Sequence, residues 1–137
     1  MKIVLTAIVI GLAVLLGISS CATVPTEPLT EGEVRLLSLQ VPEGGTFRLG
    51  MAYDFNITFE AEGSPEIRRA CFSWSGDGPY CSKVNDVKYG LTRGNFTVRV
   101  TAPSISGSYY LECYAEYFRG RGTVRTNVVS SHVYSMR

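Results

Sequence analysis

Histidine is nearly absent from this chain of 137 residues, which contains a single one, His132. Most catalytic arrangements need a positioned general base, and histidine is the residue that most often supplies it. The acidic residues are scattered, and the spacing of a calcium-binding loop does not occur. The sequence therefore predicts a protein with no catalytic residues, no metal and no cofactor.

The chain also lacks a surplus of charge of either sign. All 12 acidic residues and all but one of the 13 basic residues follow residue 20, so this part carries no net formal charge. Proteins that hold nucleic acids by their phosphates need clustered lysine and arginine. Here only Arg119, Arg121 and Arg125 lie near one another, and we expect no nucleic-acid partner.

Helical periodicity is missing after the first 20 residues, whereas strand periodicity is strong. Apolar and polar residues alternate strictly over Tyr53–Glu62 and again over Asn95–Ala102, which places one kind of side chain on each face of an antiparallel strand. The other candidate strands are Val34–Val41, Ile67–Ser75, Tyr80–Tyr89, Ser108–Phe118 and Thr123–Tyr134. We predict an all-β domain of about seven strands, with turns at 43–45, 75–79 and 120–122.

The apolar residues change face within the last predicted strand. Val124 and Val128 share one parity, whereas Val129 and Val133 share the other. A β-bulge inserts one extra residue and shifts the alternation in this way. We therefore expect a bulge between Val128 and Val129.

The first 20 residues have the order of a secretory leader. A basic start at Lys2 precedes an apolar run over residues 3–16, and small or weakly polar residues follow up to Ser20. The apolar run is shorter than the ~20 residues that a transmembrane helix needs, and it ends in small residues instead of a basic anchor. We expect residues 1–20 to be removed as a signal peptide.

The expected cleavage site resembles the lipobox of bacterial lipoproteins, which has an aliphatic residue, two small residues and an invariant cysteine. The four positions are Ile18, Ser19, Ser20 and Cys21. The resemblance implies diacylglycerol on the Cys21 sulfur, cleavage before Cys21 and acylation of the new amino group, for example with palmitate. Two or three acyl chains anchor a protein stably, whereas one gives reversible attachment. The alternative is an ordinary leader followed by an incidental thiol.

The same resemblance implies a place in the bacterial cell envelope, with the membrane as a partner through the lipid anchor. Ala22 stands where an aspartate commonly signals inner-membrane retention, so the outer membrane is favoured if the organism has two membranes. Residues 21–32 are rich in Thr, Pro, Glu and Gly, and are expected to form a flexible tether. The folded domain is then expected to span residues 33–137.

The segment around Cys113 resembles the penultimate strand of immunoglobulin-like domains. Two features depart from antibody domains: Leu111 stands where a tyrosine precedes the cysteine, and Trp74 follows Cys71 by three residues instead of about a dozen. The resemblance implies the wider immunoglobulin-like or fibronectin-like class. We therefore expect an immunoglobulin-like antiparallel β-sandwich.

Three cysteines follow Cys21, an odd number in a compartment that permits disulfides. If Trp74 faces the core, strand parity places Cys71 on the outer face, whereas Cys113 belongs to an inward-facing set. We expect a disulfide between Cys71 and Cys81, which would contribute roughly 2–3 kcal/mol in the chain-entropy model. The alternative is a bond from Cys71 or Cys81 to Cys113.

A candidate binding surface lies at the hairpin that this disulfide would close. Trp74, Asp77, Tyr80 and Lys83 combine aromatic and polar groups that suit the recognition of proteins or sugars. The surface would also include tyrosines of the penultimate strand, which are Tyr109, Tyr110, Tyr114 and Tyr117. The alternative is that the aromatic residues pack into the core or onto a sheet face, as aromatic residues in strands commonly do.

These features together predict a lipid-anchored protein of the cell envelope that acts as a non-catalytic binding or structural module. Its partner would be an envelope protein or a glycan. The alternative is a small thiol/disulfide redox protein or enzyme that uses Cys113 or the Cys71–Cys81 pair.

The lipid anchor leads to a prediction about mass. The mature protein should begin at Cys21 and carry diacylglycerol on its sulfur, whereas Cys21→Ser should remove the acceptor and leave the leader attached. Mass spectrometry of the intact protein, extracted from the envelope, measures both changes. An unmodified Cys21 thiol on the mature protein would contradict the anchor.

Overall fold

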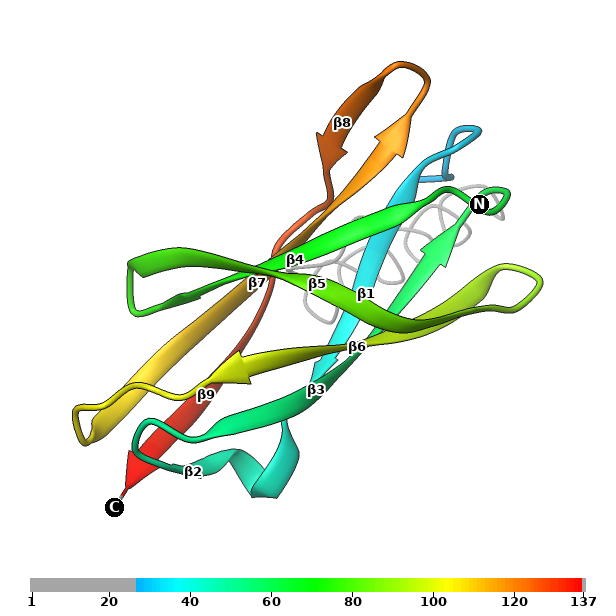
Figure 1. The fold of residues 1–137 in the computed structure, drawn as a ribbon. Coiled ribbons are helices and arrows are strands. Elements are labelled where there is room, and N and C mark those ends of the chain that lie inside the picture. Colours follow the sequence, from blue (N-terminus) through cyan, green and yellow to red (C-terminus); the bar gives the residue numbers. More distant parts are fainter. Residues whose placement is uncertain (1–26, 137) are drawn as a thin grey trace, which may run out of the picture.

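The computed structural model describes residues 27–136, and nearly all of this part forms β-strands (Figure 1). Its nine strands are β1 (Val34–Gln40), β2 (Thr46–Arg48), β3 (Ala52–Ala61), β4 (Ile67–Trp74), β5 (Asp77–Tyr89), β6 (Arg93–Thr101), β7 (Gly107–Arg119), β8 (Gly122–Arg125) and β9 (Val129–Met136). One 3-10 turn, η1 (Pro42–Gly45), precedes β2. The predicted all-β fold is confirmed. The expected leader and Cys21 lie outside the described residues.

Nine strands replace the predicted seven for two local reasons. β2 has three residues, too few for alternation to be visible in the sequence, and it forms because it pairs in parallel with β9. The predicted last strand is two strands, since β8 ends at Arg125 and β9 begins at Val129. The expected bulge is therefore wrong, and an irregular segment of three residues makes the change of face.

Strand β5 turns the sheet back on itself because its two halves pair with different strands. Residues up to Lys83 pair with β4, whereas residues from Val84 onward pair with β6. The resulting strand order is β1-β3-β6-β5-β4-β7-β9-β2, and β8 pairs with β7 beside this path. All neighbours are antiparallel except β2 and β9.

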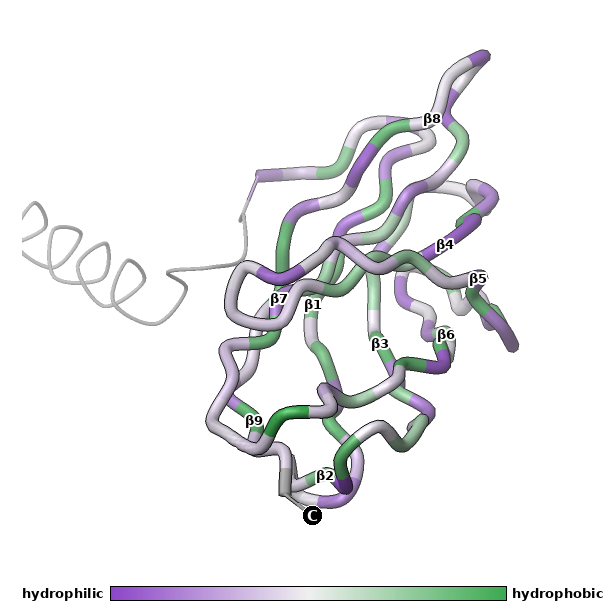
Figure 2. Tube along the Cα trace, turned by 60° about the vertical axis from the view of Figure 1, so that its left-hand side comes forward, coloured by the Kyte–Doolittle hydropathy of each residue, from purple (hydrophilic) through white to green (hydrophobic). Residues whose placement is uncertain are grey.

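The core lies between the two halves of the curled sheet. Phe55 of β3 faces Phe72 of β4 with ring centroids 5.6 Å apart, and both side chains are about 1% exposed. The alternation over β3 buries Phe55, Ile57 and Phe59, and hydrophobic residues lie along the interior in Figure 2. Each of these large side chains stabilises the fold by a few kcal/mol.

The hairpin between β4 and β5 is tighter than predicted. Its turn consists of Ser75 and Gly76 alone, both with positive φ, as a two-residue hairpin turn requires. Pairing resumes at Trp74 with Asp77, and the register shifts over Gly78 and Pro79. The predicted turn through Pro79 therefore belongs largely to β5.

A side-chain amide connects the two ends of the chain. The Leu36 amide in β1 donates a hydrogen bond of 2.8 Å to Asn127 Oδ1, and Asn127 Nδ2 donates one of 3.0 Å to the Leu36 carbonyl. Leu36 lies where the register between β1 and β3 shifts. The Asn127 side chain thus bonds Leu36 as a residue of a neighbouring strand would. Its amide group offers both a donor and an acceptor, as a peptide group does.

The described part of the expected tether contacts the domain. The Arg35 guanidinium donates a hydrogen bond of 2.5 Å to the Glu27 carbonyl, and Arg119 bonds the Thr30 hydroxyl. The amide of Gly32 also donates to the Glu62 carbonyl at 3.1 Å. Residues 27–32 therefore lie against the end of the domain that carries the β7–β8 hairpin.

Within residues 27–136, the structure has no helix with the length and apolar content that crossing a membrane requires.

The Asn127 contacts predict a loss of stability on substitution. Asn127→Ala should lower the free energy of unfolding by about 2 kcal/mol, because two part-buried backbone groups of Leu36 lose their partners. Asn85→Ala is the matched control, since Asn85 is an exposed residue of β5. Urea denaturation measures both variants, and equal midpoints would contradict the proposed role of Asn127.

Candidate functional site: an aromatic groove beside strand β5

The crossing of β5 from β4 to β6 opens a gap on each side of the strand. One gap, which we call the aromatic groove, has a volume of about 580 Å³ and lies between the first half of β5 and the end of β6. Its lining comprises Gly50, Phe72, Trp74, Asp77, Tyr80, Ser82, residues 99–105 and Tyr109. Its volume falls within the range of pockets that bind small ligands.

The floor of the aromatic groove is rigid because its rings pack on one another. Trp74 is 5% exposed and meets Tyr109 edge-to-face at 6.0 Å and Phe47 at 6.2 Å between ring centroids. The Tyr109 hydroxyl donates a hydrogen bond of 2.5 Å to the Ile105 carbonyl, which holds the loop after β6 against this floor. Edge-to-face pairs of this kind are favourable beyond the area they bury.

The rim of the groove is exposed and carries one charge of each sign. Ile105 is 73% exposed and Tyr80 57%. The Tyr80 hydroxyl donates a hydrogen bond of 2.9 Å to Asp77, and this bond, together with the negative charge of Asp77, raises the pKa of Tyr80. On the opposite rim, Arg99 contacts Asp54 at 3.1 Å, a pair that solvent screens because both side chains are largely exposed.

The structure brings together three of the four predicted surface residues. Trp74, Asp77 and Tyr80 all line the aromatic groove, although Trp74 is part of the core as well. Lys83 lines the second gap instead, on the part of β5 where the strand changes partners from β4 to β6. Tyr109 of the penultimate strand also lines the groove, as the sequence suggested, whereas Tyr110, Tyr114 and Tyr117 do not. Sequence reasoning missed Ile105, which could have been noticed as an isolated apolar residue among serines.

The second gap, which we call the polar cavity, has a volume of about 840 Å³ and lies between the start of β4 and the middle of β5. Arg69 Nε lies 2.8 Å from Glu116 Oε1 there, and the exposed Cys81 and Lys83 also line it. Five of its eleven lining residues are charged, and two more carry hydroxyl groups. The larger cavity therefore offers a ligand fewer apolar contacts than the aromatic groove does.

The predicted disulfide between Cys71 and Cys81 is present and joins directly opposite residues of β4 and β5. The Glu116 carboxylate lies 3.6 Å from the Cys71 sulfur. These three residues have the types and closeness of metal ligands. In the disulfide form, however, neither sulfur is a thiolate, and thiolates are the form in which cysteine binds metals.

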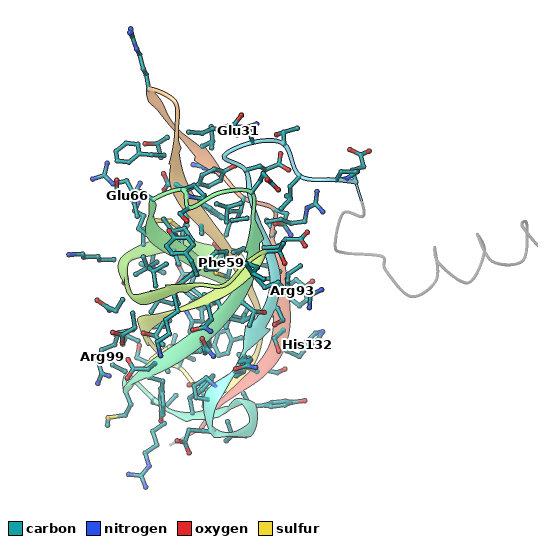
Figure 3. All side chains as sticks on the ribbon, turned by 90° about the vertical axis from the view of Figure 1, so that its right-hand side faces the viewer. Glu31, Phe59, Glu66, Arg93, Arg99 and His132 are labelled. Carbon is teal, nitrogen blue, oxygen red and sulfur yellow. A yellow bond between two sulfur atoms is a disulfide. The ribbon has the colours of Figure 1, made fainter. Side chains whose placement is uncertain are left out.

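Cys113 and His132 lie on opposite faces of the sheet. Cys113 is a buried free cysteine, fully enclosed by the core, and burial raises the pKa of its thiol. His132 is exposed, faces outward and packs against Tyr110 with ring centroids 5.1 Å apart (Figure 3). The two side chains therefore do not form the nucleophile and base pair that the alternative hypothesis needs.

Comparison with known proteins assigns no family to the chain. No family model matches its sequence, and no curated protein matches it. Among solved structures it is similar to AvmM, described as catalysing macrocyclization in alchivemycin A biosynthesis, with a TM-score of 0.38 and 7% identity over 75% of this chain and 89% of that chain. A likeness this distant carries no argument about function.

The cysteine arrangement predicts a labelling pattern for the acylated protein. Without reductant, the native protein should not react with iodoacetamide at pH 9, because the raised pKa and burial of Cys113 keep its thiol protonated and enclosed. One thiol should react in guanidinium chloride, and three after reduction. Mass spectrometry counts the adducts, and peptide mapping that found Cys113 in a disulfide would contradict this arrangement.

Proposed function

We propose that this chain is a lipid-anchored protein of the bacterial cell envelope that acts as a non-catalytic binding module, with the aromatic groove as its ligand site. The anchor is supported by residues Ile18–Cys21, which lie outside the described part of the structure. The outer membrane is the favoured location in an envelope with two membranes.

The position of the aromatic groove carries this proposal. Residues 27–33 enter the domain beside the β7–β8 hairpin, whereas Gly50, Ile105 and Tyr109 lie toward the opposite end, near the C-terminus (Figure 1). A domain anchored through its N-terminus thus presents the groove away from the membrane. That is where a ligand in the surrounding envelope is accessible.

An immunoglobulin-like class is supported by the strand order. The order β1-β3-β6-β5 corresponds to strands A, B, E and D of that class, and β4-β7-β9 corresponds to C, F and G. In this correspondence β5 provides strand D only with its second half. The aromatic groove then occupies the place beside β6 that a longer strand D would fill.

The chemistry of the groove fits a protein segment or a glycan. Its aromatic floor offers flat apolar surface, while the rims offer the Asp77 carboxylate as a hydrogen-bond acceptor and the Arg99 guanidinium as a donor. Pockets of this kind combine apolar contact area with a few polar groups that orient the ligand.

Thiol/disulfide exchange is a second candidate function, which one observation favours. Cys81 is exposed in the polar cavity, so an attacking thiolate could reach its sulfur, form a mixed disulfide there and release Cys71 as a thiol. Incubation with reduced glutathione, followed by mass spectrometry, tests for this adduct at Cys81. A disulfide that persists unchanged would leave the binding function as the sole candidate.

Trp74 provides a direct test of the binding site, because it is the single tryptophan of the chain and lines the groove. Titration with soluble peptidoglycan fragments, and separately with peptides from envelope proteins, should change its emission when a ligand occupies the groove. Ile105→Asp and Tyr80→Ala should each weaken binding of that ligand at least about tenfold, by removing rim contacts.

Tyr134→Ala is the matched control for these variants. Tyr134 is 52% exposed, close to the exposure of Tyr80, but it lies on β9 outside the groove lining. Its substitution should leave the affinity unchanged. Equal affinities for the wild type, Ile105→Asp and Tyr80→Ala would contradict the groove as the binding site.

A further inference from the structure

The β7–β8 hairpin projects beyond the body of the domain at the end where the chain enters (Figures 1 and 2). All eight of its residues from Phe118 to Arg125 are exposed, and they include three arginines and no acid. The Arg68 guanidinium lies 4.4 Å from the centre of the Phe118 ring. The hairpin thus combines exposed apolar surface with clustered positive charge.

The charge of this hairpin is only partly neutralised by nearby acids. Arg119 lies 3.8 Å from Glu33, and Glu31 and Glu66 lie at the same end of the domain (Figure 3). In the part of the chain that the structure describes, no acidic group lies within 4 Å of the guanidinium groups of Arg68 and Arg121. Two arginines at this end thus have no partner of opposite charge.

The length of chain before the described part limits how far this end can lie from a bilayer. The Glu27 carbonyl is bonded to Arg35, and Thr30 is bonded to Arg119, which fixes the entry of the chain beside the hairpin. Five residues lie between Cys21 and Glu27, and the six steps from one residue to the next span at most about 20 Å when fully extended. Acyl chains on Cys21 therefore keep the hairpin near the lipid headgroups.

From these observations we infer a second membrane contact: the β7–β8 hairpin lies in the headgroup region of an anionic phospholipid bilayer, beside the lipid anchor. The inference rests on the proposed anchoring at Cys21. Phe118 contacts the interface, while Arg68 and Arg121 contact lipid phosphates. With two points of contact the domain has a defined orientation, in which the aromatic groove faces away from the bilayer.

An introduced tryptophan at the hairpin tests this contact. The acylated full-length mature protein carrying Phe118→Trp is reconstituted into phosphatidylethanolamine and phosphatidylglycerol vesicles, with and without brominated acyl chains. We expect the introduced indole to be quenched about twofold or more by the brominated lipids. In the wild type the fluorescence comes from Trp74 alone. Brominated lipids should leave this fluorescence unchanged, because the aromatic groove lies at the other end of the domain.

Charge variants test the recognition of anionic lipid. Arg68→Gln combined with Arg121→Gln, in the Phe118→Trp background, should reduce quenching to the level seen with phosphatidylcholine vesicles, because each arginine strengthens contact with an anionic surface several-fold. Arg99→Gln, an exposed arginine on the groove rim, is the matched control and should keep full quenching. Quenching that is equal in both lipid compositions would overturn the recognition of anionic headgroups.

Co-sedimentation with the vesicles separates this inference from the proposed anchor. If the protein sediments with vesicles and the introduced indole is not quenched, the anchor stands and the hairpin contact is overturned. If the protein fails to sediment, the anchor is contradicted and the hairpin inference falls with it. Far-UV circular dichroism of each variant verifies that the fold is retained.

Discussion

Strand β5 has to pair with two different neighbours, and the main features of the molecule follow from this constraint. Its first half pairs with β4 and its second half with β6, so the sheet turns back on itself and encloses the core. A strand cannot fill the space beside both neighbours along its whole length. The aromatic groove and the polar cavity are the two spaces that remain, one on each side of the crossing.

The two ends of the domain have different chemistry. At the end where the chain enters, ion pairs and hydrogen bonds of Arg35 and Arg119 hold residues 27–33, and the β7–β8 hairpin extends beyond them. At the other end, Trp74 and Tyr109 form an apolar floor. If Cys21 is anchored as proposed, the short segment before Glu27 limits its distance from the domain, and the contacts that fix the chain's entry would then place this end at the membrane and the aromatic groove away from it.

Much of the fold could be predicted from the sequence because strand alternation is a local property. The inward faces of β3 and β6, the outward position of Cys71 and the inward position of Cys113 all follow from a period of two. Local patterns were insufficient where pairing involves distant residues. β2 exists through its contact with β9, and the segment around Asn127 leaves the strand to bond Leu36.

By itself, the sequence determined the alternation that decides which residues face the core and which cysteines lie within reach of each other, and it predicts a leader that ends in a lipobox-like segment. Tertiary structure alone decided that Tyr109 and Ile105 join Trp74 in one groove, and that Lys83 lies in another cavity. The physical reason is that alternation depends on neighbouring residues. The position of the groove depends on where β5 changes partners, and its lining joins residues far apart in the chain, from Gly50 to Tyr109.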